Sequence, residues 1–417
     1  MRRTRAEHAR ARTRPADEVL VTGMGATTPL GADVAGTWEA LLAGKSGIAP
    51  IGAPWADRLP VRIAGGMYRD PYSEVERVRR RRLDRSQAAA LVAAEEAWAD
   101  AGRPRVEAER LAVVVGTGIG GALTMLDQYD VLNQRGRRAM SPYTVPRLMP
   151  NGASAVVSLM LGARAGTHAP TSACASGAEA IAVGALLIRA GRADVVVAGG
   201  TDACLHPLSL GAFAQMRALS LRNDAPEQAS RPFDRQRDGF VMSEGAGMVV
   251  LERADFARSR GARAHAALAG AGVTSDAHDI TLPDAKGQVR AIEEALRDAG
   301  LTGGDIGHVN AHATGTPQGD VAESRAVMSA VGGHPVVTAN KSSTGHLLGA
   351  SGAVEAILTV LALKESVVPP VRNLEEAGDG IELDLVRGQP RRAEAGAALS
   401  TSFGFGGHNV VLAFTRV

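Results

Sequence analysis

The sequence contains one cysteine in a setting that favours nucleophilic chemistry. Cys174 stands in the segment 171–177, directly before an Ala-rich stretch that predicts a helix. A thiol at a helix N-terminus meets free N–H groups and the positive end of the helix dipole, and both favour its thiolate. A small buried core residue is the competing interpretation of a lone cysteine, and it is the one that we adopt for Cys204.

Two histidines in the second half of the chain favour the catalytic interpretation. His312 follows a predicted strand in the segment 310–317, which is rich in small and hydroxyl residues. Lys341 and His346 both stand in the segment 340–346, immediately before a second Ala-rich helix. A thiol and two imidazoles in one cavity could combine a nucleophile with two hydrogen-bond donors.

The elements that must position these residues alternate along the chain. Short β-branched runs predict strands at Val19–Thr22, Leu111–Val115, Asp194–Ala198, Met248–Leu251, Val309–Asn310 and Val410–Phe414. Ala- and Leu-rich stretches predict helices at Gln87–Ala101, Ser176–Ala190, Gln288–Ala299 and Gly352–Lys364. Alternation of strands and helices is typical of an α/β fold.

An internal repeat indicates two related halves. The tetrapeptide Ala175–Ala178 recurs as Ala350–Ala353, and each copy opens an Ala-rich helix. The run Gly245–Leu251 is matched in the same order by Gly406–Leu412. If the halves are related by a pseudo-twofold axis, the two helix openings face each other and bring the cysteine and both histidines together.

The composition restricts the remaining possibilities. The chain has 417 residues, 45% hydrophobic and 22% charged, with two cysteines, which excludes a disulfide framework and favours the cytoplasm. No Cys/His spacing resembles a metal site, and no apolar stretch reaches the roughly 20 residues of a membrane span. We therefore expect neither a metal nor a membrane location, and the chain lacks a linker between independent domains.

The charge is concentrated at the N-terminus. Six arginines and one acid lie between Met1 and Arg14, so we expect residues 1–17 to form a flexible basic arm, with no nucleic acid as partner. Residues 18–262 then form a half that carries the nucleophile. Residues 263–417 form a half that carries the two histidines.

Two glycine-rich motifs are better explained as turns. The run Gly116–Gly121 satisfies the dinucleotide pattern GxGxxG but lacks the second strand that ends in an acid. The run Gly44–Ser46 ends like a phosphate-binding loop, but Glu39 stands where that loop needs glycine. Neither motif predicts a nucleotide cofactor.

Taken together, the motifs resemble those of a known family, the elongating β-ketoacyl-acyl carrier protein synthases of type II fatty acid and polyketide synthesis. The resemblance runs from Val19 to Phe414 and rests on ordered motifs: Val21–Gly25, Ala173–Gly177, the segment Arg217–Phe240, Gly245–Gly247, both histidine segments and Ser402–Gly407. It implies the thiolase-like fold, in which two pseudo-symmetric halves form a five-layered α-β-α-β-α core.

The resemblance also implies a role for each matching residue. Cys174 takes the acyl group, its N–H and that of Phe405 form an oxyanion hole, and His312 and His346 stabilise the enolate that decarboxylation produces. The other implied positions are the charged pair Lys341 and Glu355, the phosphopantetheine-binding Thr314 and Thr316, the acyl pocket and gate at Ile119, Phe213, Phe403 and Phe405, and carrier-protein docking at Arg81 and Arg82.

The implied reaction is a decarboxylative Claisen condensation of malonyl-acyl carrier protein with a cysteine-bound acyl chain. The carrier protein brings the phosphopantetheine, so no other cofactor is implied, and a homodimer is expected from the family. The alternative is an active subunit that needs a silent chain-length partner in an obligate heterodimer. A thiolase would have a second catalytic cysteine, an initiating synthase would have Asn in place of His346, and a silent partner would lack Cys174.

Three positions depart from the common pattern of the family. Thr144 stands where many bacterial members have an aromatic residue near the acyl pocket, Thr401 stands where Asn is frequent, and His408 replaces a common Thr. These differences leave the preferred acyl chain open.

Overall fold

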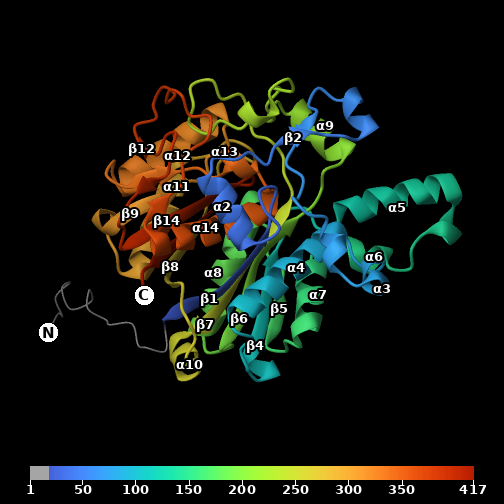
Figure 1. Cartoon of the computed structure of the whole chain (residues 1–417), viewed down its shortest axis with the longest axis horizontal. Coiled ribbons are helices and arrows are strands. Elements are labelled where there is room, and N and C mark those ends of the chain that lie inside the picture. Colours follow the sequence, from blue (N-terminus) through green and yellow to red (C-terminus); the bar gives the residue numbers. More distant parts are fainter. Residues whose placement is uncertain (1–17) are drawn as a thin grey trace.

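A computed structural model describes residues 18–417, and the basic arm predicted for residues 1–17 lies outside the described residues. One mixed sheet of 11 strands runs through the molecule in the order β12-β10-β9-β14-β15-β8-β1-β7-β6-β4-β5. Figure 1 shows this sheet with helices on its outer faces and further helices at the centre of the molecule. The expected α/β class is therefore confirmed.

Each half of the sheet has the same internal pattern. In the first half, β5, β4 and β6 are parallel, and β7 and β1 follow antiparallel. In the second half, β10, β9 and β14 are parallel, and β15 and β8 follow antiparallel. The strands are β1 (Val19–Thr27), β4 (Leu111–Gly116), β5 (Gly166–His168), β6 (Val195–Asp202), β7 (Gly245–Arg253), β8 (Ala266–Ser275), β9 (Ile306–Asn310), β10 (Val336–Thr338), β12 (Asp384–Leu385), β14 (Ala397–Gly404) and β15 (His408–Thr415).

The two halves meet where β1 pairs antiparallel with β8 over Val19–Val21 and Ala266–Leu268. The matched sequence runs Gly245–Leu251 and Gly406–Leu412 lie on the corresponding strands β7 and β15. The prediction of two pseudo-symmetric halves is thus confirmed. The boundary placed between residues 262 and 263 stays a prediction, and it falls in the loop between α10 and β8.

The central layer consists of α8 (Ser176–Arg189) and α14 (Ser351–Glu365), the two helices that the repeated tetrapeptide opens. The helices approach closely because each has a glycine at the contact. A Cβ atom on Gly177 would lie 2.7 Å from the Gly349 carbonyl oxygen, and one on Gly352 would lie 2.8 Å from Cβ of Ala178. All residues of α14 from Ser351 to Leu363 are buried, as expected for a helix covered on every side.

The outer layers complete the five-layered core. Helices α4 and α7 pack on the first half of the sheet, and α11 covers β8 and β15 with α12 beside it. The remaining helix bounds are α2 (Val34–Leu42), α3 (Arg77–Arg80), α4 (Arg85–Asp100), α5 (Ala122–Arg135), α6 (Thr144–Leu148), α7 (Gly152–Leu161), α9 (Pro207–Gln215), α10 (Ala254–Ser259), α11 (Ala285–Ala299), α12 (Pro317–Ala330) and α13 (Lys341–Thr344).

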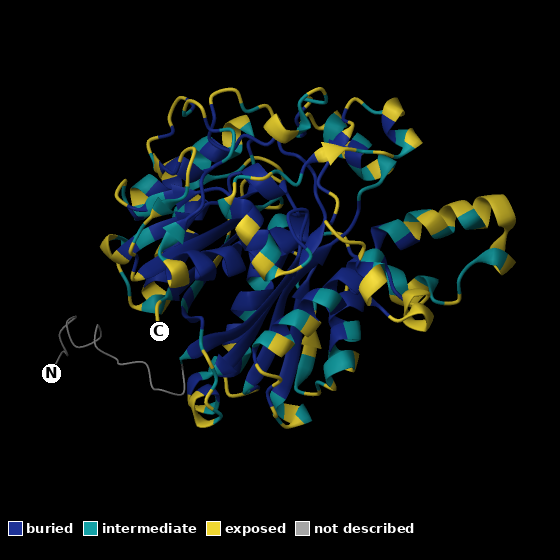
Figure 2. Cartoon of the chain, viewed as in Figure 1, coloured by how far each residue is buried: buried dark blue, intermediate teal, exposed yellow. Residues whose placement is uncertain are grey.

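One helix projects from the body of the molecule. Figures 1 and 2 show α5 extending away from the sheet with much of its surface exposed. It carries the exposed apolar side chains of Met125, Tyr129 and Leu132 at helical spacing, so one apolar face of α5 is uncovered. Within residues 18–417, no helix combines the length and apolarity that a membrane crossing needs.

Candidate active site

The cysteine predicted as nucleophile lies at a strained turn. Cys174 is in the 3₁₀ turn Ala173–Ala175 that leads into α8, and Ala173 adopts a positive φ of 51°. The corresponding turn before α14, Leu348–Ala350, has the same feature, with a φ of 51° at Leu348. A non-glycine residue in this region costs on the order of 1–3 kcal/mol and persists only where its surroundings hold it.

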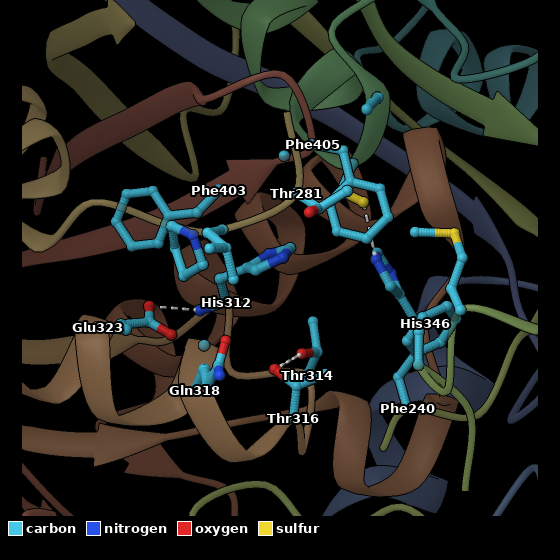
Figure 3. A pocket seen from close by; sticks show the side chains of 18 of the residues that line it. Phe240, Thr281, His312, Thr314, Thr316, Gln318, Glu323, His346, Phe403 and Phe405 are labelled. Carbon is cyan, nitrogen blue, oxygen red and sulfur yellow. Dashed lines mark hydrogen bonds between the residues drawn. The ribbon is translucent and has the colours of Figure 1, made fainter. Parts of the chain in front are cut away.

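The structure brings the cysteine and both histidines together. His346 Nε2 lies 3.0 Å from Cys174 Sγ, and the centroids of the His312 and His346 rings are 5.5 Å apart. One ligand-type atom from each of the three residues lies within 4.8 Å of the others. Figure 3 shows the two imidazoles pointing toward each other across the cavity. They come from the loop after β9 and the segment before α14.

Hydrogen bonds fix which ring nitrogen carries the proton. The Leu348 N–H donates to His346 Nδ1 at 3.3 Å, and the Lys341 ammonium donates to His312 Nδ1 at 3.2 Å. Both Nδ1 atoms are therefore acceptors, and each Nε2 carries the hydrogen. The site thus presents two imidazole N–H donors, one of them directed at the Cys174 sulfur.

Lys341 and Glu355 form the expected charged pair in the interior. The Lys341 ammonium lies 2.5 Å from Glu355 Oε1 and donates to the His312 carbonyl oxygen at 2.6 Å. Burial raises the pKa of Glu355 to about 7, and the neighbouring ammonium opposes this rise. The pair holds both the backbone and the ring of His312 in place.

Burial determines the protonation of the three central groups. It lowers the pKa of His312 and of His346 well below the ordinary histidine value, and the Lys341 charge adds to this effect, so both imidazoles are neutral. Burial also raises the pKa of Cys174 to about 11, although Lys341 and the Phe405 N–H act in the opposite direction. The N–H groups at the helix start favour the thiolate as expected, but desolvation outweighs them.

This protonation state predicts how the thiol reacts with an alkylating agent. With a pKa of about 11 for Cys174, the alkylation rate by iodoacetamide should rise about tenfold per pH unit from pH 7 to pH 9, because the thiolate remains a small fraction throughout. Intact-mass spectrometry of the Cys204→Ala variant, whose only thiol is Cys174, measures this rate. A plateau below pH 9 would contradict the raised pKa.

Sequence reasoning missed the acids that hold the His312 loop. Glu323 on α12 accepts the N–H groups of His312 and Ala313 at 2.8 and 2.6 Å, and the Thr401 hydroxyl at 2.6 Å. Asp320, one turn earlier, accepts the Gly315 N–H at 3.1 Å. Both acids are buried, and two acids three residues apart after the histidine loop were the available signal.

A cavity of about 490 Å³ contains the predicted pocket residues. Thr314 and Thr316 line it, and their hydroxyl oxygens lie 3.1 Å apart. Figure 3 marks this hydrogen bond with a dashed line. The other predicted residues that line it are Ile119, Phe213, Phe403 and Phe405. Phe213 contacts Phe240 edge to face, and Phe403 stands 6.2 Å from the His312 ring centroid.

The predicted gate segment contains two consecutive glycines with positive φ, Gly406 and Gly407. The Gly406 N–H donates to the Ile280 carbonyl at 2.8 Å, and the Gly407 carbonyl accepts the Asp276 N–H at 2.9 Å. The segment next to Phe405 is thus tied to the loop after β8, so any movement of the predicted gate involves both segments.

The predicted docking arginines lie outside the cavity. Arg81 and Arg82 are exposed directly after α3, in a run with Arg77, Arg79 and Arg80. The Arg82 guanidinium stacks over Tyr143 at 5.2 Å from the ring centroid. The structure therefore places a concentrated positive charge on the surface beside α6.

Comparison with known proteins identifies the family. Residues 16–257 match the N-terminal domain model of beta-ketoacyl synthases, and residues 265–375 match the C-terminal domain model. A 3-oxoacyl-[acyl-carrier-protein] synthase 2 of Mycobacterium tuberculosis is 46% identical over 404 residues, covering 95% of this chain and 97% of the relative.

Solved structures agree with these sequence matches. The ishigamide ketosynthase/chain length factor matches with a TM-score of 0.89 and 31% identity, covering 96% of this chain and 99% of the other. A type II ketosynthase in complex with its acyl-carrier protein matches with a TM-score of 0.88 and 30% identity over the same shares.

Proposed function

The chain belongs to the β-ketoacyl synthase family, and from this membership we propose that Cys174, His312 and His346 perform a decarboxylative Claisen condensation. The enzyme is an elongating β-ketoacyl-acyl carrier protein synthase. The residue assignment rests on the 3.0 Å distance between His346 Nε2 and Cys174 Sγ. His312 lines the same cavity.

The first step transfers an acyl chain to the enzyme. The Cys174 sulfur attacks the thioester carbonyl of the acyl-carrier protein, and the carrier thiol leaves with the proton that the cysteine gives up. The N–H groups of Phe405 and Cys174 lie at the sulfur, where they can stabilise the oxyanion of the tetrahedral intermediate. Because the thiol is protonated at rest, its proton must be transferred during this step.

The second step forms the carbon–carbon bond. Malonyl-carrier protein loses carbon dioxide, and the electron pair of the broken bond is delocalised onto the thioester oxygen as an enolate. The two imidazole N–H groups can donate to this oxygen without carrying a charge themselves. The enolate carbon then attacks the acyl carbonyl, the β-ketoacyl-carrier protein is released, and the Cys174 sulfur takes up a proton.

We assign no metal or redox cofactor to this chemistry. The set Cys174, His312 and His346 has a spacing that could bind a cation, but His312 Nδ1 already accepts from the Lys341 ammonium. A cation bound to His312 would be repelled by this buried charge. Both cysteines are free thiols, which fits a reducing compartment, and we propose the cytoplasm.

Carrier-protein docking at the arginine run has a direct test. The double variant Arg81→Glu/Arg82→Glu should raise the KM for malonyl-carrier protein about tenfold and weaken its salt dependence, because these side chains attract an acidic partner. Steady-state kinetics measure this effect, with malonyl-coenzyme A as a substrate without carrier protein and Arg105→Glu, an exposed arginine on another loop, as the control. An equal KM increase for malonyl-coenzyme A would refute the docking role.

The apolar face of α5 supports a dimer. Met125, Tyr129 and Leu132 are 52%, 62% and 41% exposed, and single helices rarely leave such a face uncovered. A homodimer is the proposed state. An obligate heterodimer with a chain-length partner is the alternative, since a ketosynthase/chain length factor is among the structural neighbours. Expression of the chain alone separates them, because a stable and active homodimer excludes the heterodimer requirement.

Mass spectrometry tests the proposed function as a whole. Incubation with a panel of acyl-carrier proteins of different chain lengths should add one acyl group to Cys174 and none to Cys204. The accepted lengths would define the acyl specificity. Absence of any adduct on Cys174, in an enzyme that still condenses, would overturn the assignment of the nucleophile.

A further inference from the structure

A buried carboxylate outside the cysteine and histidine set joins the two halves of the molecule. Asp202 is the last residue of β6 and is fully buried. Its Oδ1 accepts the Thr117 hydroxyl at 2.7 Å, and its Oδ2 accepts the N–H groups of Gly118 and Gly349 at 2.8 and 2.7 Å. These donors come from the loop after β4 in the first half and from the turn before α14 in the second.

The backbone is shaped around this carboxylate. A Cβ atom on Gly349 would lie 2.6 Å from Asp202 Oδ2 and 2.5 Å from the Gly118 nitrogen, and one on Gly118 would lie 3.0 Å from the same oxygen. Only glycine leaves room for both N–H groups to reach one oxygen. The run Gly116–Gly121, which formally matches a dinucleotide motif, therefore binds the Asp202 carboxylate of the protein itself.

The turn that Asp202 holds also controls His346. Gly349 follows Leu348, whose strained φ of 51° needs support from its surroundings. The Leu348 N–H donates to His346 Nδ1, and this donation is what leaves Nε2 as the N–H donor facing Cys174. The Ser351 hydroxyl, 2.9 Å from the same Nδ1, can donate or accept and cannot fix the tautomer by itself.

We propose that Asp202 is a positioning residue for the decarboxylation step: it holds the Leu348–Gly349 turn so that His346 keeps its Nε2 proton directed into the cavity. The carboxylate makes no hydrogen bond to Cys174. Transfer of the acyl chain to the cysteine should therefore depend on it much less than decarboxylation does. This inference rests on the proposed role of His346.

Asp202→Ala tests the proposal through the ratio of two partial reactions. We expect malonyl decarboxylation, measured as carbon dioxide release, to fall at least thirtyfold, while acylation of Cys174, measured by mass spectrometry, stays within about threefold of the wild type. Asp202→Asn retains one acceptor oxygen that can serve Gly118 and Gly349, so it should recover most of the decarboxylation. A merely structural role would lower both reactions together.

Two further variants keep the test decisive. Gly349→Ala leaves the carboxylate in place but pushes the turn away from it, so it should likewise lose decarboxylation and retain acylation of Cys174. It therefore tests the proposal independently if Asp202→Ala fails to fold. Asp234→Ala removes another fully buried carboxylate, one that accepts the N–H groups of Gln236 and Glu375, and should leave the ratio of the two reactions unchanged.

The possible outcomes separate this proposal from the general function. If the wild-type enzyme decarboxylates malonyl-carrier protein and both Asp202→Ala and Gly349→Ala do so at the same rate, the role of Asp202 is refuted while the proposed function stands. If the wild-type enzyme does not decarboxylate, the proposed function itself fails.

Discussion

Replacing Cys174 with alanine is expected to abolish condensation, by about 10⁴-fold or more, and to leave malonyl decarboxylation measurable. The variant has no sulfur to hold the acyl chain, so no carbon–carbon bond can form. The two imidazole N–H donors stay in place, because their positions depend on Lys341 and Leu348 rather than on the cysteine. Product analysis and carbon dioxide release measure the two activities separately.

Cys204→Ala is the matched control for this experiment. Cys204 is buried in an apolar cluster with Leu210 and Leu219 and does not itself line the cavity. Its loss should leave both condensation and acylation near the wild-type level. Condensation at the normal rate in Cys174→Ala would show that the mechanism is wrong.

Removal of either histidine is expected to have the second large effect. His312→Ala and His346→Ala should each lower malonyl decarboxylation by about 10²–10³-fold, the usual loss when one donor to a developing oxyanion is removed. Condensation should fall with it, because no enolate forms. In His312→Ala, acylation of Cys174 should persist, because the His312 ring makes no hydrogen bond to the Cys174 sulfur. Carbon dioxide release and intact-mass spectrometry follow the two steps.

His334→Ala provides the comparison, because His334 is exposed after α12 and lies outside the cavity. It should behave like the wild type in both assays. Wild-type decarboxylation in either His312→Ala or His346→Ala would mean that the enolate is stabilised by other groups, and the assignment of that histidine would have to be abandoned.

The elements with strong local patterns were predicted well. The run Leu111–Val115 is β4 with one residue added, and Ser176–Ala190 is α8 almost to the residue. Helix α5 was missed, although Met125, Tyr129 and Leu132 recur in it at helical spacing and form an uncovered apolar face. Strand β8 was missed because its alternating Ala and Gly residues have low β propensity, and pairing with β1 and β15 stabilises it.

The residue types that we propose for the chemistry and the order of their motifs are properties of the sequence itself. A cysteine before an Ala-rich helix, and a histidine before its repeat, were enough to predict that Cys174 and His346 would meet. The sequence could predict this contact because the repeated tetrapeptide marks the equivalent helix starts of the two symmetric halves. The chain has only two cysteines, which likewise reduced the candidates for a cysteine nucleophile to two.

Only the tertiary structure decided the state of these groups. It showed that desolvation of Cys174 outweighs the N–H groups that favour its thiolate, assigned both imidazole tautomers, and identified Glu323 and Asp202 as the carboxylates that hold the loops around the site. The physical reason is that a pKa and a tautomer depend on desolvation and on donors from distant segments. Packing of the two halves brings these partners together, and the spacing of residues along the chain does not indicate these contacts.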